Sequence, residues 1–350
     1  MSSKWQPGQL LLAGFEGLEM PEDLARLIAA GRVGGVVLFA RNIANPEQVR
    51  NLNAALHARA PEGAPLLIAI DQEGGRIQRL RNPWTQWPPM QRLGEADDSE
   101  LTAAVAHALA VELSDLGIGL DFAPCVDVDT NPANPIIGDR SFGSEPTRVA
   151  THAARFIRAM QDAGVASCAK HFPGHGDTAC DSHLELPRLD HDLARLRAVE
   201  LPPFASAIEA GVASIMTAHV LFPALDAKRP ATLSPDVMAI LREELAYDGV
   251  VFSDDLEMRA VADHHSPKAL VAGCLEAGVD SLLVCEDPGL REEVLRQLER
   301  APDARLENPL LRMIDLKQRF AGLREPLASA DRESPAPPYA EHRTLAGRFA

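Results

Sequence analysis

The 350-residue chain is 46% hydrophobic and 24% charged, a composition typical of folded globular proteins that excludes intrinsic disorder. Fifty acidic residues against 34 basic ones give a formal net charge of −16, which disfavours binding to nucleic acid. The five cysteines show no CxxC spacing, and the N-terminus lacks the apolar run of a signal peptide. We therefore expect a cytoplasmic protein with neither a nucleic-acid partner nor a membrane span.

Short apolar runs rich in Val, Ile and Leu recur along the chain, and each is bounded by glycine or by polar residues. Because the runs lack polar alternation, they are expected to be buried on both faces, as in a parallel sheet covered by helices. The expected strands are Leu10–Gly14, Gly35–Phe39, Leu66–Ile70, Gly119–Ala123, Ser167–Ala169, Ser214–Thr217, Gly249–Ser253 and Ser281–Val284.

Longer segments with apolar residues at three- and four-residue spacing separate these strands and are typical of amphipathic helices. Eight alternating units predict an α/β fold of the (β/α)₈ TIM-barrel type in a single domain. An open doubly wound sheet is the alternative, and the absence of a GxGxxG motif after any strand disfavours it. The expected helices are Pro46–Arg59, Ser99–Leu116, Thr147–Ala163, Leu193–Ala210, Pro235–Leu245 and Pro267–Ala277.

The end of the chain differs in composition from the segments before it. Residues 326–350 are rich in Pro, Ala and Arg and show no strand pattern. We expect residues 1–325 to form the barrel and residues 326–350 to form a C-terminal appendage.

Barrel enzymes collect their active sites at the C-terminal ends of the strands, and an ionisable residue follows or ends each expected strand here. Ordinary loop polarity can explain each of these residues singly, so the motifs around them carry more weight. The strand-end candidates are Glu16, Arg41, Asp71, Asp121, Lys170, His171, His219, Asp254, Asp255 and Glu286.

The densest motif is KHFPGHGDTACDSHLELP at residues 170–187, which combines three histidines with glycines and prolines typical of a loop. Acid/base catalysis is one interpretation, because Asp181 and His183 share a face if the segment is extended. A structural role for the histidines in the loop is another. The third is metal binding, for which the candidate ligands are His171, His175, Asp177 and His183.

Three further motifs carry charged residues near strand ends. In GVVFSDDLEM, alternation predicts that only one of Asp254 and Asp255 faces the barrel mouth, where it could act as a nucleophile or base, and Asp255 is expected to cap the next helix. IDQEGGRIQR places Asp71 at a strand end and Arg76 and Arg79 beside a glycine turn, where the arginines could bind phosphate, or the carboxylate and an arginine could bind sugar hydroxyls. NPIIGDRSFG places Arg140 in a glycine-flanked loop.

These four motifs together resemble those of family-3 glycoside hydrolases, specifically the bacterial β-N-acetylhexosaminidases of cell-wall recycling. The resemblance covers about residues 8–290 and implies a barrel fold, Asp254 as nucleophile, and His183 as general acid/base with Asp181 as its dyad partner. It implies no metal or organic cofactor. The positions that would hold the N-acetylglucosamine unit are Asp71, Arg79, Arg140, Lys170 and His171.

The resemblance implies a retaining glycosidase that removes N-acetylglucosamine from small-molecule muropeptide fragments with an anhydromuramoyl aglycone. Because His183 belongs to a glycine-rich loop, we expect this loop to move during turnover. A phosphorylase, a metal-dependent barrel hydrolase and a non-catalytic sugar-binding protein are the alternatives. The sequence indicates no particular oligomeric state.

Overall fold

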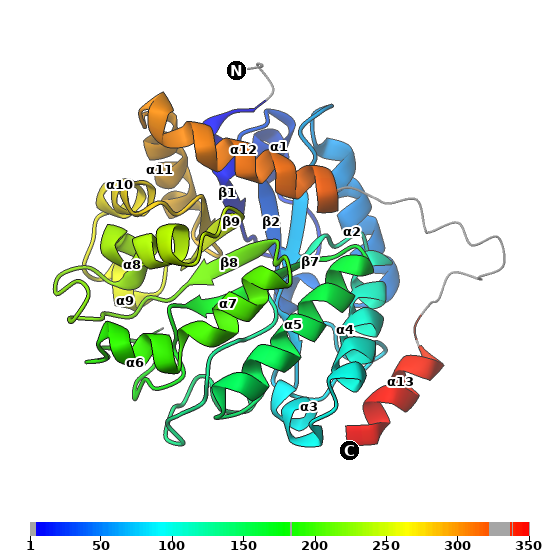
Figure 1. Ribbon diagram of the computed structural model, residues 1–350. Helices are drawn as coiled ribbons and strands as arrows, with labels where there is room; N and C mark the ends of the chain where they lie inside the picture. The colour runs from blue at the N-terminus through cyan, green and yellow to red at the C-terminus, as the bar shows by residue number, and fades with distance from the viewer. Residues whose placement is uncertain (1–4, 183, 322–336, 338, 350) are drawn as a thin grey trace.

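Eight parallel strands form a closed barrel in the computed structural model, which describes residues 5–182, 184–321, 337 and 339–349 (Figure 1). The barrel closes where β1 pairs in parallel with β10. The predicted single-domain (β/α)₈ barrel is therefore confirmed. Its strands are β1 (Leu11–Ala13), β2 (Gly35–Leu38), β3 (Leu67–Ile70), β6 (Leu120–Asp121), β7 (Ala166–Phe172), β8 (Ser214–Thr217), β9 (Val250–Asp255) and β10 (Ser281–Val284).

Helices cover the outside of the barrel (Figure 1). Side-chain N-caps fix several of their starts; Asn45, for example, accepts a hydrogen bond from the Gln48 amide at the start of α2. The α-helices are α1 (Glu22–Ala29), α2 (Pro46–Arg59), α3 (Met90–Ala96), α4 (Ser99–Ser114), α5 (Pro146–Asp162), α6 (Leu193–Ala198), α7 (Leu201–Glu209), α8 (Pro235–Ala239), α9 (Arg259–Ala262), α10 (Pro267–Ala277), α11 (Pro288–Glu299), α12 (Asp303–Phe320) and α13 (Ala340–Ala346).

Two of the expected helices are interrupted. The segment expected as one helix over Leu193–Ala210 is split into α6 and α7, because two prolines in the first turn of α7 disfavour a continuous helix. The segment Pro235–Leu245 forms α8 and then a π-helical turn, Ile240–Glu244. Helices α2 and α10 have the bounds that the sequence predicts.

Strands β7 and β9 extend further than predicted and carry charged residues inside the sheet. Lys170 and His171 belong to β7, and Asp254 and Asp255 belong to β9. The register between β7 and β8 shifts between Lys170 and Phe172, and the register between β9 and β10 shifts at the end of β9. Such irregularities change the direction in which successive side chains point.

A small hairpin that the sequence reasoning missed follows β3. It consists of β4 (Gln72–Gly74) and β5 (Ile77–Gln78). Its turn needs glycine, since Gly74 and Gly75 have positive φ angles of 98° and 55°. A Cβ atom on Gly74 would also lie 2.3 Å from the Pro88 carbonyl oxygen. This turn directs the following residues back over the barrel mouth.

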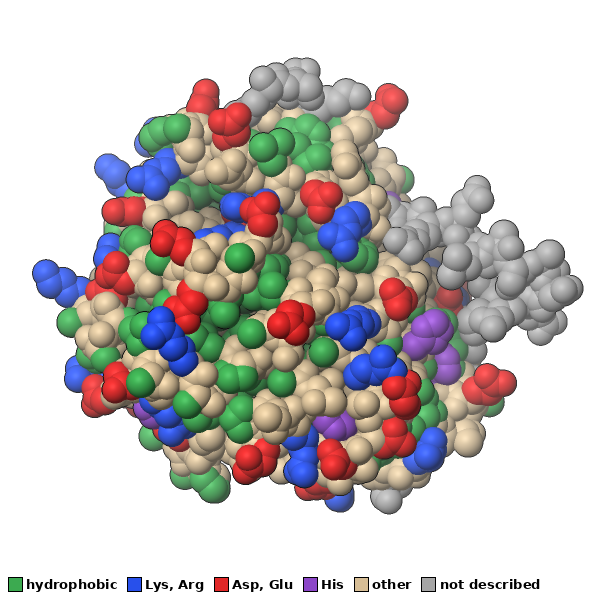
Figure 2. All heavy atoms as spheres, viewed as in Figure 1, with side chains coloured by type: hydrophobic (Ala, Val, Ile, Leu, Met, Phe, Trp, Pro, Cys, Tyr) green, Lys and Arg blue, Asp and Glu red, His purple; other side chains and the backbone are tan. Residues whose placement is uncertain are grey.

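The described part of the C-terminal segment includes α13, which lies against α4 on the outside of the barrel (Figure 1). On the face shown in Figure 2, the described Lys and Arg side chains are interspersed with Asp and Glu rather than gathered in a basic patch. Among the described helices, none combines the length and the apolar character that crossing a membrane requires.

Candidate active site

One cavity opens at the C-terminal ends of the barrel strands and collects most of the predicted site residues. Its lining combines charged side chains with the apolar residues Phe39, Phe122 and Met216. Both Asp254 and Asp255 line it, so the prediction that only one of these neighbours reaches the barrel mouth is wrong; the register shift between β9 and β10 accounts for the difference. The other polar lining residues include Asp71, Glu73, Arg79, Arg140, Lys170, His171, His175 and Ser182.

A chain of alternating charges forms one wall of this cavity and consists of Arg140, Glu73, Lys170, Asp71 and Arg79. Arg140 donates from Nε and Nη2 to the two oxygens of Glu73 at 2.9 and 2.8 Å. Lys170 Nζ lies 2.7 Å from Glu73 Oε1 and 2.9 Å from Asp71 Oδ1. Arg79 Nη2 contacts Asp71 Oδ2 at 3.3 Å. We call this set the charge chain.

Pairing within the charge chain reverses the effect of burial on each group. Burial alone would raise the pKa of Glu73, but Arg140 and Lys170 hold it well below its usual value. Burial would likewise lower the pKa of Lys170, but Asp71 and Glu73 raise it. Glu73 and Lys170 are therefore charged at neutral pH, and the charge chain presents fixed donors and acceptors to a ligand rich in hydroxyl groups.

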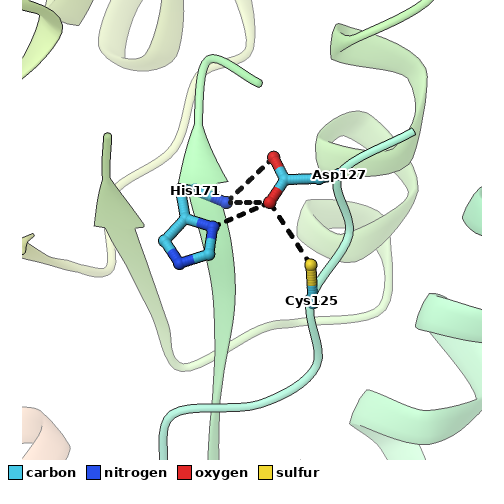
Figure 3. A group of neighbouring side chains, drawn as sticks. All are labelled: Cys125, Asp127 and His171. Carbon is cyan, nitrogen blue, oxygen red and sulfur yellow. Dashed lines mark hydrogen bonds and ion pairs between the residues drawn. The ribbon is translucent and has the colours of Figure 1, made fainter. Parts of the chain in front are cut away.

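Asp127 orients His171 through hydrogen bonds to its ring and its backbone amide (Figure 3). His171 Nδ1 lies 2.7 Å from Asp127 Oδ2, and the backbone amides of His171 and His175 also donate to the Asp127 carboxylate. Burial would raise the pKa of Asp127, but His171 and the other donors lower it to about 2. Because the charged carboxylate can only accept, His171 Nδ1 carries a proton and Nε2 faces Arg140, at 3.5 Å from its Nη2.

Cys125, Asp127 and His171 form a group that could hold a metal ion, with ligand atoms within 4.8 Å of one another (Figure 3). The chemistry of the set fits a hydrogen-bonded cluster better. Burial and the Asp127 charge raise the pKa of the Cys125 thiol well above its usual value, and its Sγ lies 3.3 Å from Asp127 Oδ2. A metal ion bound by this set through Cys125 Sγ and His171 Nδ1 would have to displace the thiol proton of Cys125 and the Nδ1 proton of His171.

Among the described residues proposed as metal ligands from the sequence, His171, His175 and Asp177 do not form a group of ligand atoms. Asp177 turns away to an ion pair with His191 at 2.9 Å and a hydrogen bond from Thr130. His175 Nδ1 and Nε2 contact the hydroxyls of Thr178 and Ser182 at 2.7 and 3.1 Å. Burial and the neighbouring His171 lower the pKa of His175 to about 4, so it is a neutral part of the loop framework.

The two carboxylates of β9 have different surroundings. Asp255 Oδ1 accepts the Glu257 amide at 3.1 Å, and Asp254 Oδ1 accepts the Asp255 amide at 2.8 Å. Burial, then the Glu257 charge, raise the pKa of Asp255 to about 8. Asp255 does not cap the next helix as expected, because the N-cap of α9 is Met258. It stabilises the turn between β9 and α9 instead.

The loop after β7 turns beyond Asp181, whereas the acid/base interpretation from the sequence depended on an extended segment there. The amides of Leu184 and Glu185 donate to the Asp181 carbonyl oxygen at 2.9 and 3.1 Å, so the chain turns after Asp181. Ser182, one residue further on, lines the cavity. His183 lies outside the residues that the structure describes.

Comparison with known proteins shows the family to which this barrel belongs. The family model described as the glycosyl hydrolase family 3 N-terminal domain matches residues 5–316. The curated β-hexosaminidase of Thiobacillus denitrificans is 40% identical over 295 residues, which cover 83% of this chain and 81% of that protein. The chain belongs to glycosyl hydrolase family 3. It is a glycosidase, and the predicted resemblance to the family-3 β-N-acetylhexosaminidases is confirmed.

Solved family-3 structures share the whole fold. A β-N-acetylglucosaminidase from Paenibacillus sp. str. FPU-7 superposes with a TM-score of 0.92 and 43% identity, over 100% of this chain and 68% of that one. Native NagZ from Neisseria gonorrhoeae gives a TM-score of 0.86 and 32% identity over 99% and 98% of the two chains.

Sequence reasoning missed two residues of this family-3 site. Glu73 lies inside the quoted motif IDQEGGRIQR, but its position next to two glycines suggested a turn rather than a buried ion pair. Asp127 follows β6 in a segment without a motif, and no local signal identifies it as a partner of His171.

Several strand-end candidates support the site from outside the cavity. Asp121 accepts the Gln72 amide at 2.9 Å beneath the charge chain, and burial raises its pKa to about 8. His219 contacts Thr232 through Nδ1 and the Asp255 carbonyl oxygen through Nε2, at 2.8 and 3.0 Å. Arg41 pairs with Glu16 and Glu286 around the residues that follow β1 and β10.

Proposed function

We propose that this glycosidase is a retaining β-N-acetylglucosaminidase that removes terminal N-acetylglucosamine from muropeptide fragments. The observation that carries the proposal is the cavity itself, in which the charge chain and Asp254 border one space at the end of the barrel. Curated relatives named β-hexosaminidase and solved relatives named β-N-acetylglucosaminidase support the glycone. Neutral sugars suit the charge chain, because paired groups donate and accept hydrogen bonds without requiring a charged ligand.

Asp254 is the proposed nucleophile, which attacks the anomeric carbon and forms a covalent glycosyl-enzyme. The neighbouring Asp255 is the natural rival, since both carboxylates line the cavity. A carboxyl whose pKa is raised to about 8 is mostly protonated at neutral pH and is a poor nucleophile. The surroundings of Asp255 therefore favour Asp254.

Mass spectrometry after reaction with a 2-acetamido-sugar fluoride tests this assignment. A slow substrate of this kind should trap the glycosyl-enzyme, and the label should lie on Asp254. Asp254→Ala should lower turnover on the order of 10³- to 10⁵-fold while leaving the circular dichroism spectrum unchanged. A label on Asp255 or Glu257 would refute the assignment.

The proposed acid/base pair is His183 with Asp181 as its orienting partner. A carboxylate beside an imidazole favours the protonated ring, which keeps a useful fraction of the acid near neutral pH. His183 would protonate the leaving oxygen and then act as base toward water. The position of Ser182 on the cavity wall supports the placement of this loop segment near the reacting bond.

Leaving-group dependence tests the acid/base pair. Asp181→Ala and His183→Ala should slow glycosylation of poor leaving groups about 10²- to 10³-fold, and that of acidic phenols much less. Asp181→Ala should also lower the alkaline limb of the pH–rate profile. Equal losses for every aryl glycoside, measured before the steady state, would remove His183 from this role.

The natural substrate is proposed to be a disaccharide peptide with an anhydromuramoyl aglycone, acted on in the cytoplasm as part of cell-wall recycling. The reduced state expected for five unpaired cysteines supports this location, and all five are free thiols in the structure. Hydrolysis of such a fragment by purified protein is the direct assay. If an aryl β-glucoside without the acetamido group reacted as fast, the proposed glycone specificity would be wrong.

Two rival reactions have direct tests. The Cys125, Asp127 and His171 group motivates a chelation assay, in which a metal-dependent hydrolase would lose activity and regain it with zinc. We expect chelation to leave the rate unchanged. A phosphorylase would release sugar 1-phosphate in phosphate buffer, whereas a hydrolase releases the free sugar in any buffer.

A further inference from the structure

Helix α13 contacts the barrel wall through a small set of specific side-chain interactions. His342 Nδ1 lies 2.8 Å from Glu112 Oε1, and the Tyr339 hydroxyl donates to Asp115 Oδ2 at 3.1 Å. The barrel closes between β1 and β10, and α12 ends at Phe320. Helix α13 is therefore not needed to close the barrel, and its contacts serve another purpose.

Glu112 connects α13 to the loop that follows β5. Its side chain on α4 is 1% exposed, and besides His342 it accepts hydrogen bonds from the Thr85 hydroxyl and the Thr85 amide. Thr85 is itself fully buried. The same carboxylate therefore fixes both the C-terminal helix and residues 79–89, which we call the β5–α3 loop.

Two further contacts join α13 to the β5–α3 loop directly. The rings of His342 and Trp87 lie with centroids 5.9 Å apart, and Arg343 Nη2 donates to the Pro83 carbonyl oxygen at 2.9 Å. The ring of Tyr339 stacks on that of His342, with the two centroids 5.1 Å apart. His342 thus contacts both Tyr339 in the C-terminal segment and Trp87 in the loop.

Hydrogen bonds connect the β5–α3 loop to β5, which leads to the cavity. Gln78 Nε2 donates to the Thr85 carbonyl oxygen at 2.8 Å, and Gln78 Oε1 accepts the Trp87 amide at 3.0 Å. The Gly75 amide donates to the Trp87 carbonyl oxygen at 2.9 Å, which closes the hairpin turn over the loop. Gln78 immediately precedes Arg79, so the position of Arg79 depends on this hydrogen-bonded framework.

Arg79 is the loosest member of the charge chain. Its Nη2 lies 3.3 Å from Asp71 Oδ2, and its guanidinium lies over the Phe39 ring at 5.6 Å. Its Nε is buried without a hydrogen-bond partner among the described residues. In contrast, Arg140 makes two contacts of 2.9 Å or less to Glu73. The backbone at the start of the β5–α3 loop, where the Arg79 amide donates to Gln72 Oε1 at 2.8 Å, therefore places Arg79 more firmly than its own ion pair does.

We propose that α13 holds the β5–α3 loop so that Arg79 meets the sugar, with His342 and Glu112 as positioning residues. The proposal rests on the proposed function for the identity of the ligand at Arg79. Loss of a positioning contact should weaken the binding of substrate and transition state alike, which raises KM and changes kcat little.

Steady-state kinetics on an aryl N-acetylglucosaminide test the proposal. His342→Ala should raise KM about three- to tenfold with kcat within about twofold of the wild type. The matched control is His107→Ala, which removes an exposed histidine from α4 and should leave both constants unchanged. His342→Asn keeps a nitrogen donor toward Glu112 and should restore most of the affinity. Unchanged KM in His342→Ala would overturn the proposal.

The Arg79→Ala background separates positioning from general stabilisation. If His342 acts through Arg79, His342→Ala should raise KM no further once Arg79 is gone. A general loss of stability would instead lower activity equally in both backgrounds, and such additivity would overturn the proposal. The urea midpoint of each variant should be measured alongside.

Limited trypsin digestion provides a readout that does not depend on the substrate. Arg81 is an exposed cleavage site within the loop, and His342→Ala should accelerate cleavage after it, whereas His107→Ala should not. If the wild type hydrolysed no N-acetylglucosaminide, the proposed function would fail while digestion still tested the loop. Equal cleavage rates in His342→Ala and the wild type would refute the support of the loop by α13.

Discussion

Two buried lysines at separate places in this barrel have pKa values shifted in opposite directions. Lys170 lines the cavity between the carboxylates of Asp71 and Glu73, which raise its pKa. Lys317 on α12 is fully buried, donates to Gln9 Oε1 at 2.7 Å, and lies 5.5 Å from the Trp5 ring. With no carboxylate in contact among the described residues, burial lowers its pKa to about 7.

The comparison shows that burial does not by itself determine the charge of a lysine. Both ammonium groups lose the same hydration, and the difference lies in what replaces the water. Two carboxylates keep Lys170 charged where it can bind a ligand, whereas Lys317, which contacts an amide oxygen instead, is only about half protonated at pH 7. Four substitutions test this contrast.

Lys170→Met should cause the largest loss, because it leaves Asp71 and Glu73 facing each other without the cation they share. We expect kcat/KM on an aryl N-acetylglucosaminide to fall on the order of 10²- to 10³-fold. Lys317→Met is the matched control and should keep kcat/KM within about twofold. Comparable losses in both variants would contradict the assignment of Lys170 to the site.

Glu73→Gln should lower stability more than any surface substitution, since it leaves Arg140 and Lys170 as buried cations with one counter-charge removed. Breaking a buried pair on one side costs about 3 kcal/mol, measured as the free energy of unfolding in urea at pH 7. Glu299→Gln removes the partner of Arg32 from a half-exposed pair and should cost less than about 1 kcal/mol. Equal costs would show that Glu73 is not the centre of the charge chain.

Lys317→Met should change how stability depends on pH. The folded pKa is lowered to about 7 and the unfolded value is near 10.4, so protonation penalises the folded state fully below pH 7. That penalty declines as the pH rises toward the unfolded value. Relative to Lys317→Met, the wild type should therefore gain about 2 kcal/mol between pH 7 and pH 9. A constant difference would mean that Lys317 keeps its proton in the folded state.

Trp5→Leu should cause the smallest loss of folding stability, and only at a pH below about 7. The ring of Trp5 can stabilise Lys317 only while the ammonium is charged, which requires a pH below about 7. We expect a loss of about 0.5–1 kcal/mol at pH 6 and none at pH 9. An equal loss at both values would indicate that Trp5 contributes through apolar packing alone.

The barrel was predictable from the sequence because its strands are unbroken apolar runs. Strands β8 and β10 begin and end where those runs do. The ends of β7 and β9 were placed too early, since Lys170 and Asp254 have the polarity of loop residues. What allows Lys170 into a strand is an ion pair with Asp71, which is 99 positions away in the chain. No local pattern contains that information.

The site was predictable where a motif marks it and not elsewhere. The motifs placed Asp71, Arg140 and Asp254 at one cavity. They did not reveal Asp127 or the contact of His342 with Glu112, which joins residues 230 positions apart. Both are supports for other side chains, and their importance depends on three-dimensional neighbours rather than on residue type.

The charge chain also affects the entropy of ligand binding. A long side chain such as arginine or lysine loses up to about 2 kcal/mol of rotational freedom when it is fixed in one conformation. In this protein Arg140 and Lys170 are fixed by Glu73 when the chain folds, before any ligand arrives. A sugar that enters the cavity does not have to order them again. The conformational entropy of these two side chains is therefore lost during folding and not during binding, which increases the affinity of the cavity for its ligand.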